Sequence, residues 1–448
     1  MILLFCCHPL TGHVTPVLRI AAGLHQRGWR VAFLSSPFFR ARIEAAGLQF
    51  VPLTGMVEYL DDDSLFDRSP VVMDGATEAG LPQSVTDSRH QTVYALADEW
   101  TSLKAAITSL TAEDPGQHIL VVSEAFFYGS MPLRHHFSEY PSVVPASLCV
   151  SITAPAIRSV DLPPFGNLAP FDQSPEGKAR SAALWDAWTA QVAPLTAVLQ
   201  EKLSESGVED SSAVFMAGSN YACHSAIAQV GVPSFEFPRS DFTPGFRIVG
   251  VVPPVVPKAP PPFPWWNEVV TARQKECKVV VVAQGTVETE PTELILPTMR
   301  LLGEREDILT VAILGVRGAS LKGPLPPNSR VADYLSYDAI LPYASLWVHN
   351  GGYGATMHGI THGVPQVLAG DTQDKPESGK RVAYCGVGVD LQTAKPKEEA
   401  LEKAITMVLS DPKYLSTALR MQAEAAGMDC VGNVEALVKG LIETTEKQ

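Results

Sequence analysis

A proline-rich stretch in the middle of the chain separates two regions that share one pattern. Six of the ten residues from 253 to 262 are proline, which indicates an extended linker rather than a helix or a central strand. On both sides of it, short apolar runs alternate with amphipathic stretches, as in a parallel sheet covered by helices. We therefore predict two α/β domains with a ligand cleft between them. They span residues 1–252 and 278–430, with a linker at 253–277 and a C-terminal helix at 431–448.

The individual elements follow from the apolar runs and their periodicity. Strands are expected at residues 2–6, 31–34, 119–122, 147–151, 214–216, 247–251, 278–283, 310–314, 330–332, 346–348 and 366–368. Helices are expected at residues 16–27, 355–362, 397–409 and 433–445. The acidic segment 58–87 favours an irregular, mobile loop on the surface.

The composition restricts the classes of partner and the compartment. Hydrophobic residues make up 46% of the 448 residues and charged residues 18%, which is typical of a folded, soluble protein. The net charge of −14 argues against a nucleic-acid partner or an anionic membrane. Seven cysteines are scattered without the spacing of zinc ligands, and no apolar run reaches the roughly 18–20 residues of a membrane helix. The apolar N-terminus lacks a preceding basic segment, so we expect it to form a first strand rather than a signal peptide. We therefore expect a cytoplasmic protein.

Two glycine-containing turns are candidates for binding an anion. One lies at residues 350–354, after the apolar run 344–348, and the other contains Gly285 and Thr286, after the strand expected at 278–283. Glycine lets the backbone approach a ligand closely, and the N-terminus of a following helix offers N–H groups to a phosphate. Each turn alone is also compatible with an ordinary strand-to-helix connection.

His13 and Glu124 are candidates for acid–base chemistry. Each follows an expected strand, and ligands bind at the strand ends of open α/β sheets. An imidazole there can act as a general base near neutral pH, and a carboxylate can orient it. The alternative is that each side chain caps the helix that follows it. The loop around His13 lacks the G-x-G-x-x-G pattern, which argues against a dinucleotide-dependent dehydrogenase.

Taken together, these segments resemble the family 1 glycosyltransferases, the UDP-glycosyltransferases of the GT-B fold. The resemblance extends in order along nearly the whole chain, through residues 12–16, 123–127, 284–286, 331–334, 340–341, 350–354, 362–365, 374–375, 381–382 and 386–388. It implies two Rossmann-like domains with a donor and acceptor cleft between them. It also implies an inverting, metal-independent transfer of a sugar, glucose being expected, from a UDP-sugar to a hydroxyl group of a lipophilic small molecule.

The resemblance also implies roles for individual residues. His13 would be the general base, and Glu124 would stand where the family has an aspartate. Tyr334 would stack on the uracil, and Asp374 and Lys375 would face the sugar hydroxyls. The complete set of expected donor contacts is Gly12, Gly285, Thr286, Tyr334, Leu335, His349, Asn350, Gly352, Gly354, Ala355, Thr356, His358, Asp374 and Lys375. The expected acceptor contacts are Phe38, Phe127, Tyr128 and Phe165, and no metal ligand or cofactor is expected.

Four further positions depart from the family pattern. Asn350 replaces a histidine before the glycine pair, and His358 replaces the glutamate that binds the ribose. Lys375 replaces the glutamine of the sugar-binding pair, and Ser378 replaces an asparagine that follows it. Alternatives to O-glycosyl transfer are C-glycosyl transfer to a phenol, a nucleotide-sugar epimerase of the same fold, and a non-catalytic homologue that binds the nucleotide.

Overall fold

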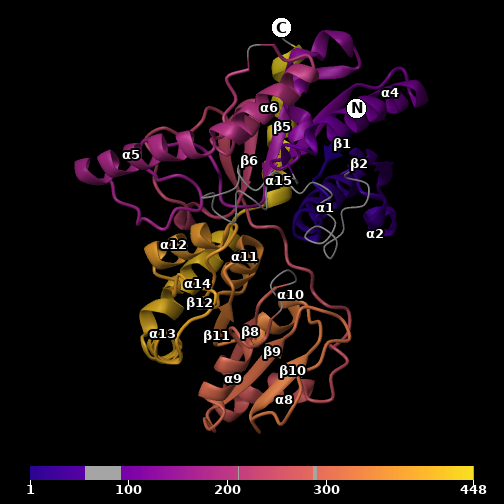
Figure 1. Ribbon diagram of the computed structural model, residues 1–448. Coiled ribbons are helices and arrows are strands. Elements are labelled where there is room, and N and C mark those ends of the chain that lie inside the picture. The colour runs from indigo at the N-terminus through magenta and orange to yellow at the C-terminus, as the bar shows by residue number, and fades with distance from the viewer. Residues whose placement is uncertain (56–91, 210, 286–289, 447–448) are drawn as a thin grey trace.

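The computed structural model describes residues 1–55, 92–209, 211–285 and 290–446. Figure 1 shows two α/β lobes, one built from the N-terminal half of the chain and the other from the C-terminal half. The last helix, α15 (Cys430–Glu446), runs back into the N-terminal lobe. The acidic segment 58–87, which was expected to form a mobile loop, lies outside the described residues.

The N-terminal lobe contains a parallel sheet of seven strands in the order β3-β2-β1-β4-β5-β6-β7. Its strands are β1 (Ile2–Cys6), β2 (Arg30–Ser35), β3 (Gln49–Pro52), β4 (Ile119–Glu124), β5 (Val143–Ser151), β6 (Ala226–Val230) and β7 (Phe246–Gly250). Alternate residues of β1 pack into two different layers, since Leu3 and Phe5 contact α1 and α15 while Ile2 and Leu4 face α4. Both faces of the sheet are therefore buried, as its apolar strands require.

The C-terminal lobe repeats this architecture with six parallel strands in the order β10-β9-β8-β11-β12-β13. They are β8 (Lys278–Ala283), β9 (Ile308–Ile313), β10 (Ser329–Ala332), β11 (Leu346–His349), β12 (Gln366–Leu368) and β13 (Gly388–Asp390). Val280 and Val282 of β8 pack under α9 and α13, and Val279 and Val281 pack under α8. Uninterrupted valines suit a strand that is covered on both faces.

The helices follow the strands as crossover connections. In the N-terminal lobe they are α1 (Thr11–Gln26), α2 (Arg40–Ala45), α4 (Leu96–Glu113), α5 (Pro175–Gln191), α6 (Ala193–Glu205) and α7 (Ser219–Ala222). In the C-terminal half they are α8 (Trp266–Ala272), α9 (Ile295–Leu302), α10 (Tyr337–Ile340), α11 (Tyr353–His362), α12 (Lys375–Cys385), α13 (Glu398–Ser410), α14 (Pro412–Ala426) and α15. No helix within the described ranges is long and apolar enough to cross a membrane.

Two expected elements differ from the structure. Residues 214–216 do not form a strand; they enter a turn in which Met216 has a φ of 49°, a conformation that no strand contains. The sixth strand of the sheet is β6 instead, which the sequence prediction missed. Helix α1 begins at Thr11 rather than at Pro16, so Gly12 and His13 lie in its first turn and not in a preceding loop.

Candidate functional site

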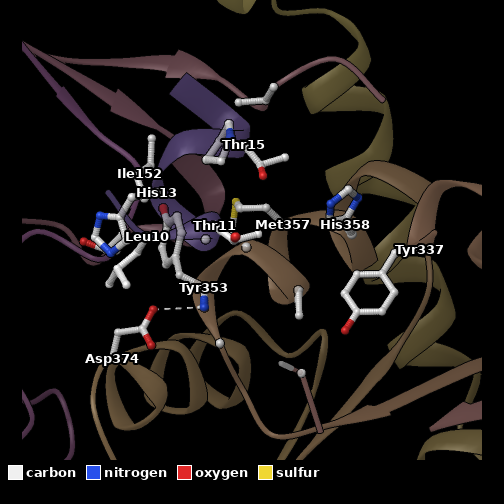
Figure 2. A pocket seen from close by; sticks show the side chains of 18 of the residues that line it. Leu10, Thr11, His13, Thr15, Ile152, Tyr337, Tyr353, Met357, His358 and Asp374 are labelled. Atoms are coloured by element: carbon white, nitrogen blue, oxygen red, sulfur yellow. Dashed lines mark hydrogen bonds between the residues drawn. The ribbon is translucent and has the colours of Figure 1, made fainter. Parts of the chain in front are cut away.

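A cavity of about 470 Å³ lies between the lobes and is lined by both of them. Its N-terminal wall comes from the start of α1 and from segments near the ends of β4, β5, β6 and β7. Its C-terminal wall comes from the turn after β11, the face of α11 and the start of α12. Figure 2 shows side chains from the two walls pointing toward one another. The cavity thus occupies the carboxyl ends of parallel strands, where α/β sheets bind ligands.

His13 lies in this cavity next to a buried carboxylate. The Nδ1 atom of His13 is 3.2 Å from Oε1 of Glu124, whose side chain is completely buried. Glu124 is the last residue of β4, and Ser123 beside it pairs in register with Cys6, just before the loop that leads into α1. Neighbouring strands therefore bring the two groups together. The ring of Phe126 packs edge-on against His13 at 5.3 Å between centroids, which restricts the imidazole further.

His8 lies close to this pair but has a different environment. Its ring is fully buried, and its Nδ1 is 3.4 Å from Oε1 of Glu99. Burial, with a smaller contribution from His13, lowers the pKa of His8 well below its ordinary value. His8 is absent from the cavity lining, so its place behind His13 is that of a supporting residue.

The turn after β11 presents the N-terminus of α11 to the cavity. Gly351 has a φ of 87°, which favours glycine, and Gly352 is the N-cap residue. The amide of Tyr353 donates to Oδ2 of Asp374 at 3.0 Å (Figure 2). Gly354 and Ala355, the next two residues, line the cavity. Their N–H groups precede the first carbonyl partner within the helix, so they are available to an anion.

Three residues of the expected donor set differ in how they are placed around this turn. Asn350 lines the cavity, and its amide donates to the carbonyl of Gln284. The ring of His349 is buried; its Nδ1 accepts from the Gly351 amide at 3.1 Å and its Nε2 lies 2.8 Å from Oε1 of Gln366. The Thr356 hydroxyl donates to the Gly352 carbonyl at 3.1 Å. His349 and Thr356 hold the turn in shape through these hydrogen bonds. Neither residue lines the cavity.

The second glycine turn is described only in part. Gly285 lines the cavity and has a φ of 84°, a conformation that L side chains rarely adopt. Thr286, the other donor contact expected here, lies outside the described residues. Gly12, from the first turn of α1, lines the opposite wall.

Tyr334 and Leu335 line the far end of the C-terminal wall. The Tyr334 ring is 43% exposed, and the guanidinium carbon of Arg317 lies 4.1 Å from its centroid, a cation–π contact. His358, on α11, also lines the cavity, and its Nδ1 is 2.7 Å from Oδ1 of Asp338. Neither Arg317 nor Asp338 was among the residues expected from the sequence.

Asp374 and Lys375 lie at the start of α12, and both line the cavity. Asp374 is engaged with the α11 N-terminus through Tyr353. The Lys375 ammonium donates to the Thr372 hydroxyl at 2.8 Å and to Oε1 of Gln373 at 3.1 Å. The two residues therefore connect the end of the glycine turn with the loop before α12.

The expected acceptor residues are only partly found in the cavity. Phe165 lines it, but Phe127 and Tyr128 are buried in the core of the N-terminal lobe, where neither contributes to the cavity lining. Phe38 is 59% exposed and packs against Phe39, away from the lining residues. Besides Phe165, the apolar wall contains residues that were not expected, which include Phe126, Ile152, Met216, Val230 and Val251.

Comparisons with known proteins agree with this architecture. A family model for the erythromycin biosynthesis protein CIII-like C-terminal domain matches residues 300–441. UDP-glucosyltransferase 1 of Beauveria bassiana is 35% identical over 449 residues, covering 95% of this chain and 92% of the relative. UDP-glucosyltransferase A1 of Starmerella bombicola is 33% identical, covering 94% and 88%. The chain belongs to the family 1 UDP-glycosyltransferases.

Membership of this family confirms the prediction of a UDP-dependent glycosyltransferase, which moves a sugar from a UDP-sugar. The fold is confirmed as well. A crystal structure of the glycotransferase of kitacinnamycin superposes with a TM-score of 0.70 at 19% identity, covering 99% of this chain and 98% of that one. Two lobes with parallel sheets and a shared cavity are therefore the GT-B architecture that the sequence predicted.

Proposed function

We propose that this glycosyltransferase moves glucose from UDP-glucose to a hydroxyl group of a lipophilic small molecule, with inversion at the anomeric carbon. The observation that supports it most directly is the presence of His13, Glu124 and the α11 N-terminus around one cavity. The names of the two relatives, both UDP-glucosyltransferases, favour glucose. The apolar wall contributed by the N-terminal lobe favours a lipophilic acceptor.

In the proposed mechanism, His13 takes the proton of the acceptor hydroxyl at Nε2, because Glu124 faces the Nδ1 side of the ring. The acceptor oxygen forms a bond to the anomeric carbon from the face opposite UDP. The bond from that carbon to the β-phosphate oxygen breaks, and UDP leaves with the electron pair. Glu124 orients the imidazole and stabilises the imidazolium that results.

The charge that develops on the leaving diphosphate would be stabilised by the amides of Gly354 and Ala355 and by the dipole of α11. We propose for this reason that the transfer requires no metal ion. Tyr334 would stack on the uracil, with Arg317 against its ring, and His358 would stand beside the ribose. The seven cysteines are all free thiols, which supports the expected cytoplasmic location, and the net charge of −14 supports a small-molecule partner rather than a nucleic acid.

The proposal is tested by incubating the purified chain with UDP-glucose and a panel of phenolic and terpenoid acceptors. The expected result is release of UDP with a product heavier by one hexose, whose anomeric proton shows the β configuration. An acid-stable carbon linkage would instead indicate C-glycosyl transfer, and loss of UDP-glucose without acceptor would indicate an epimerase. Binding of UDP with no turnover of any acceptor would favour a non-catalytic homologue.

A further inference from the structure

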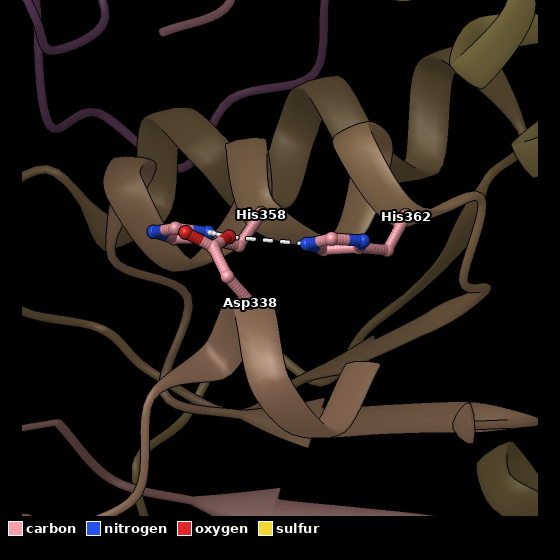
Figure 3. A group of neighbouring side chains, drawn as sticks. All are labelled: Asp338, His358 and His362. Carbon is pink, nitrogen blue, oxygen red and sulfur yellow. Dashed lines mark hydrogen bonds and ion pairs between the residues drawn. The ribbon is translucent and has the colours of Figure 1, made fainter. Parts of the chain in front are cut away.

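A carboxylate and two histidines converge beside the cavity, and none of the three takes the acceptor proton or binds the diphosphate in the proposed mechanism. Asp338 lies on α10, and His358 and His362 lie one turn apart on the same face of α11. The Oδ1 atom of Asp338 is 2.7 Å from Nδ1 of His358 and 3.0 Å from Nε2 of His362. Figure 3 shows both rings directed at this single oxygen.

We propose that Asp338, His358 and His362 bind a divalent transition metal ion of the zinc class, and that the ion stabilises the C-terminal lobe at its junction with the linker. Two imidazoles at i and i+4 on one helix face, completed by a carboxylate, form a donor set that suits Zn²⁺ and its neighbours rather than Mg²⁺ or Ca²⁺. Among the described residues, these three form the group whose donor atoms all lie within 4.8 Å of one another.

The distances are close to those that a metal requires. With bonds of about 2.0–2.2 Å, the donor atoms of a tetrahedral zinc site are separated by about 3.3–3.6 Å. The two separations from Asp338 Oδ1 are 2.7 and 3.0 Å. Each histidine nitrogen would therefore have to move away from Asp338 Oδ1 by roughly 0.3–0.9 Å for an ion to replace the two hydrogen bonds. The two histidine nitrogens themselves lie within 4.8 Å of each other.

The surroundings of the three ligands already orient them. The second oxygen of Asp338, Oδ2, accepts from the Val255 amide at 2.7 Å and lies 3.5 Å from Nη1 of Arg19, so Oδ1 is the oxygen directed at the histidines. The ring of Tyr337 packs edge-on against His358. Metal-binding carboxylates and imidazoles are held in this way by neighbours that do not touch the ion.

An ion could reach this site from the cavity, and once bound it would connect several elements of the fold. His358 and Arg19 line the cavity, so an ion can enter from it, and the fourth coordination position would be taken by water. Asp338 also contacts the linker through Val255 and α1 through Arg19. An ion bound at Oδ1 would therefore fix α11 relative to α10, the linker and the N-terminal lobe, independently of the transfer chemistry.

The test uses the full-length chain without a histidine tag, stripped with a chelator and then titrated with Co²⁺ or Zn²⁺. Wild type is expected to bind one ion per chain, with the visible absorption of Co²⁺ bound to nitrogen ligands and a rise in Tm of a few degrees with Zn²⁺. His358→Gln and His362→Gln should each weaken binding at least tenfold. The matched control is His118→Gln, which removes an exposed histidine far along the sequence from the cluster and should leave binding unchanged.

A third variant distinguishes loss of a metal ligand from loss of the fold. Asp338→Asn keeps the size and the hydrogen-bonding oxygen of the side chain but makes it a much weaker metal ligand, so it should fold and still lose the metal response. The proposal would be overturned by wild type that binds no stoichiometric ion, or by binding that survives unchanged in His362→Gln and Asp338→Asn.

Discussion

Arg381 and Glu236 form a buried ion pair that joins the two lobes, with Nη2 of the arginine 2.7 Å from Oε1 of the glutamate. Arg381 lies on α12 and also donates to Glu377 of the same helix at 2.8 Å. Glu377 in turn accepts from the Gly166 amide at 3.0 Å, next to Phe165 of the cavity wall. The helix that begins with Asp374 and Lys375 is thus connected to the acceptor side of the cavity.

Removing the Arg381 side chain should destabilise the fold. We expect Arg381→Met to lower the free energy of unfolding by about 3–5 kcal/mol, since two buried carboxylates lose their partner. Arg300→Met is the control, because Arg300 and Glu398 form an exposed pair worth about 1 kcal/mol or less. Denaturant unfolding measures both variants. Equal stability of the two would contradict a structural role for the buried pair.

Glu124→Gln tests the orientation of the base. The amide keeps the shape of the side chain but cannot stabilise a protonated His13, so we expect kcat to fall about 10²- to 10³-fold. Affinity for UDP should change less than twofold, because Glu124 is not among the residues that line the cavity. Steady-state kinetics and UDP titration separate the two effects. An unchanged kcat would show that the carboxylate is only a core residue.

Gly354→Ala tests the anion site at the start of α11. An added Cβ at Gly354 meets no protein atom within 4 Å, and the residue lines the cavity, so the methyl group would enter the space of the diphosphate. We expect an unchanged Tm and UDP binding weakened at least tenfold, about 1.4 kcal/mol. Gly440→Ala, also with open space around the added Cβ, is the control and should bind UDP as wild type does. Normal UDP binding by Gly354→Ala would place the diphosphate elsewhere.

The burial of His349 should make the stability of the fold depend on pH. Burial lowers its pKa to about 4, although the hydrogen bond to Gln366 acts in the opposite direction. Between pH 4 and the ordinary value of 6.5, the unfolded chain therefore binds more protons at this residue than the folded chain. The stability of the fold that depends on a neutral His349 is fully present above pH 6.5 and is lost as the pH falls toward 4, in total roughly 3 kcal/mol.

The measurement is the free energy of unfolding between pH 4 and 7 for wild type and for His349→Asn, whose side-chain oxygen can still accept from Gly351. The variant should show the shallower slope. Asp390 acts in the opposite direction, since burial raises its pKa to about 6, but its contribution is common to both proteins and cancels in the comparison. Parallel slopes would mean that His349 is protonated equally in both states.

Much of the fold could be predicted from local sequence, and the exceptions have physical causes. β1 and β8 lie where they were expected, because each contains a continuous apolar run that is followed by a loop with polar or glycine residues. The apolar residues 214–216 contain no signal for the left-handed conformation of Met216. β6 was missed because alanines and the polar Gln229 interrupt its apolar character, although all five of its residues are buried.

The site was predictable where one segment determines it and less so where side chains from different segments meet. The glycine turn before α11 and the position of His13 could be predicted from motifs. Which of the adjacent aromatics Phe126 and Phe127 faces the cavity depends on the backbone after β4, and the structure selects Phe126. The convergence of Asp338 with His358, which are 20 residues apart, depends on the packing of α10 against α11 and on no spacing rule.

His13→Gln tests most directly whether His13 is the base of the transfer reaction. The measurement pairs the rate of hexose transfer from UDP-glucose with the affinity for UDP, determined on the same preparation. We predict a loss of transfer of at least 10²-fold, with UDP affinity and Tm within experimental error of wild type. Transfer that continues at the wild-type rate, or a loss that UDP affinity follows in equal measure, would contradict it.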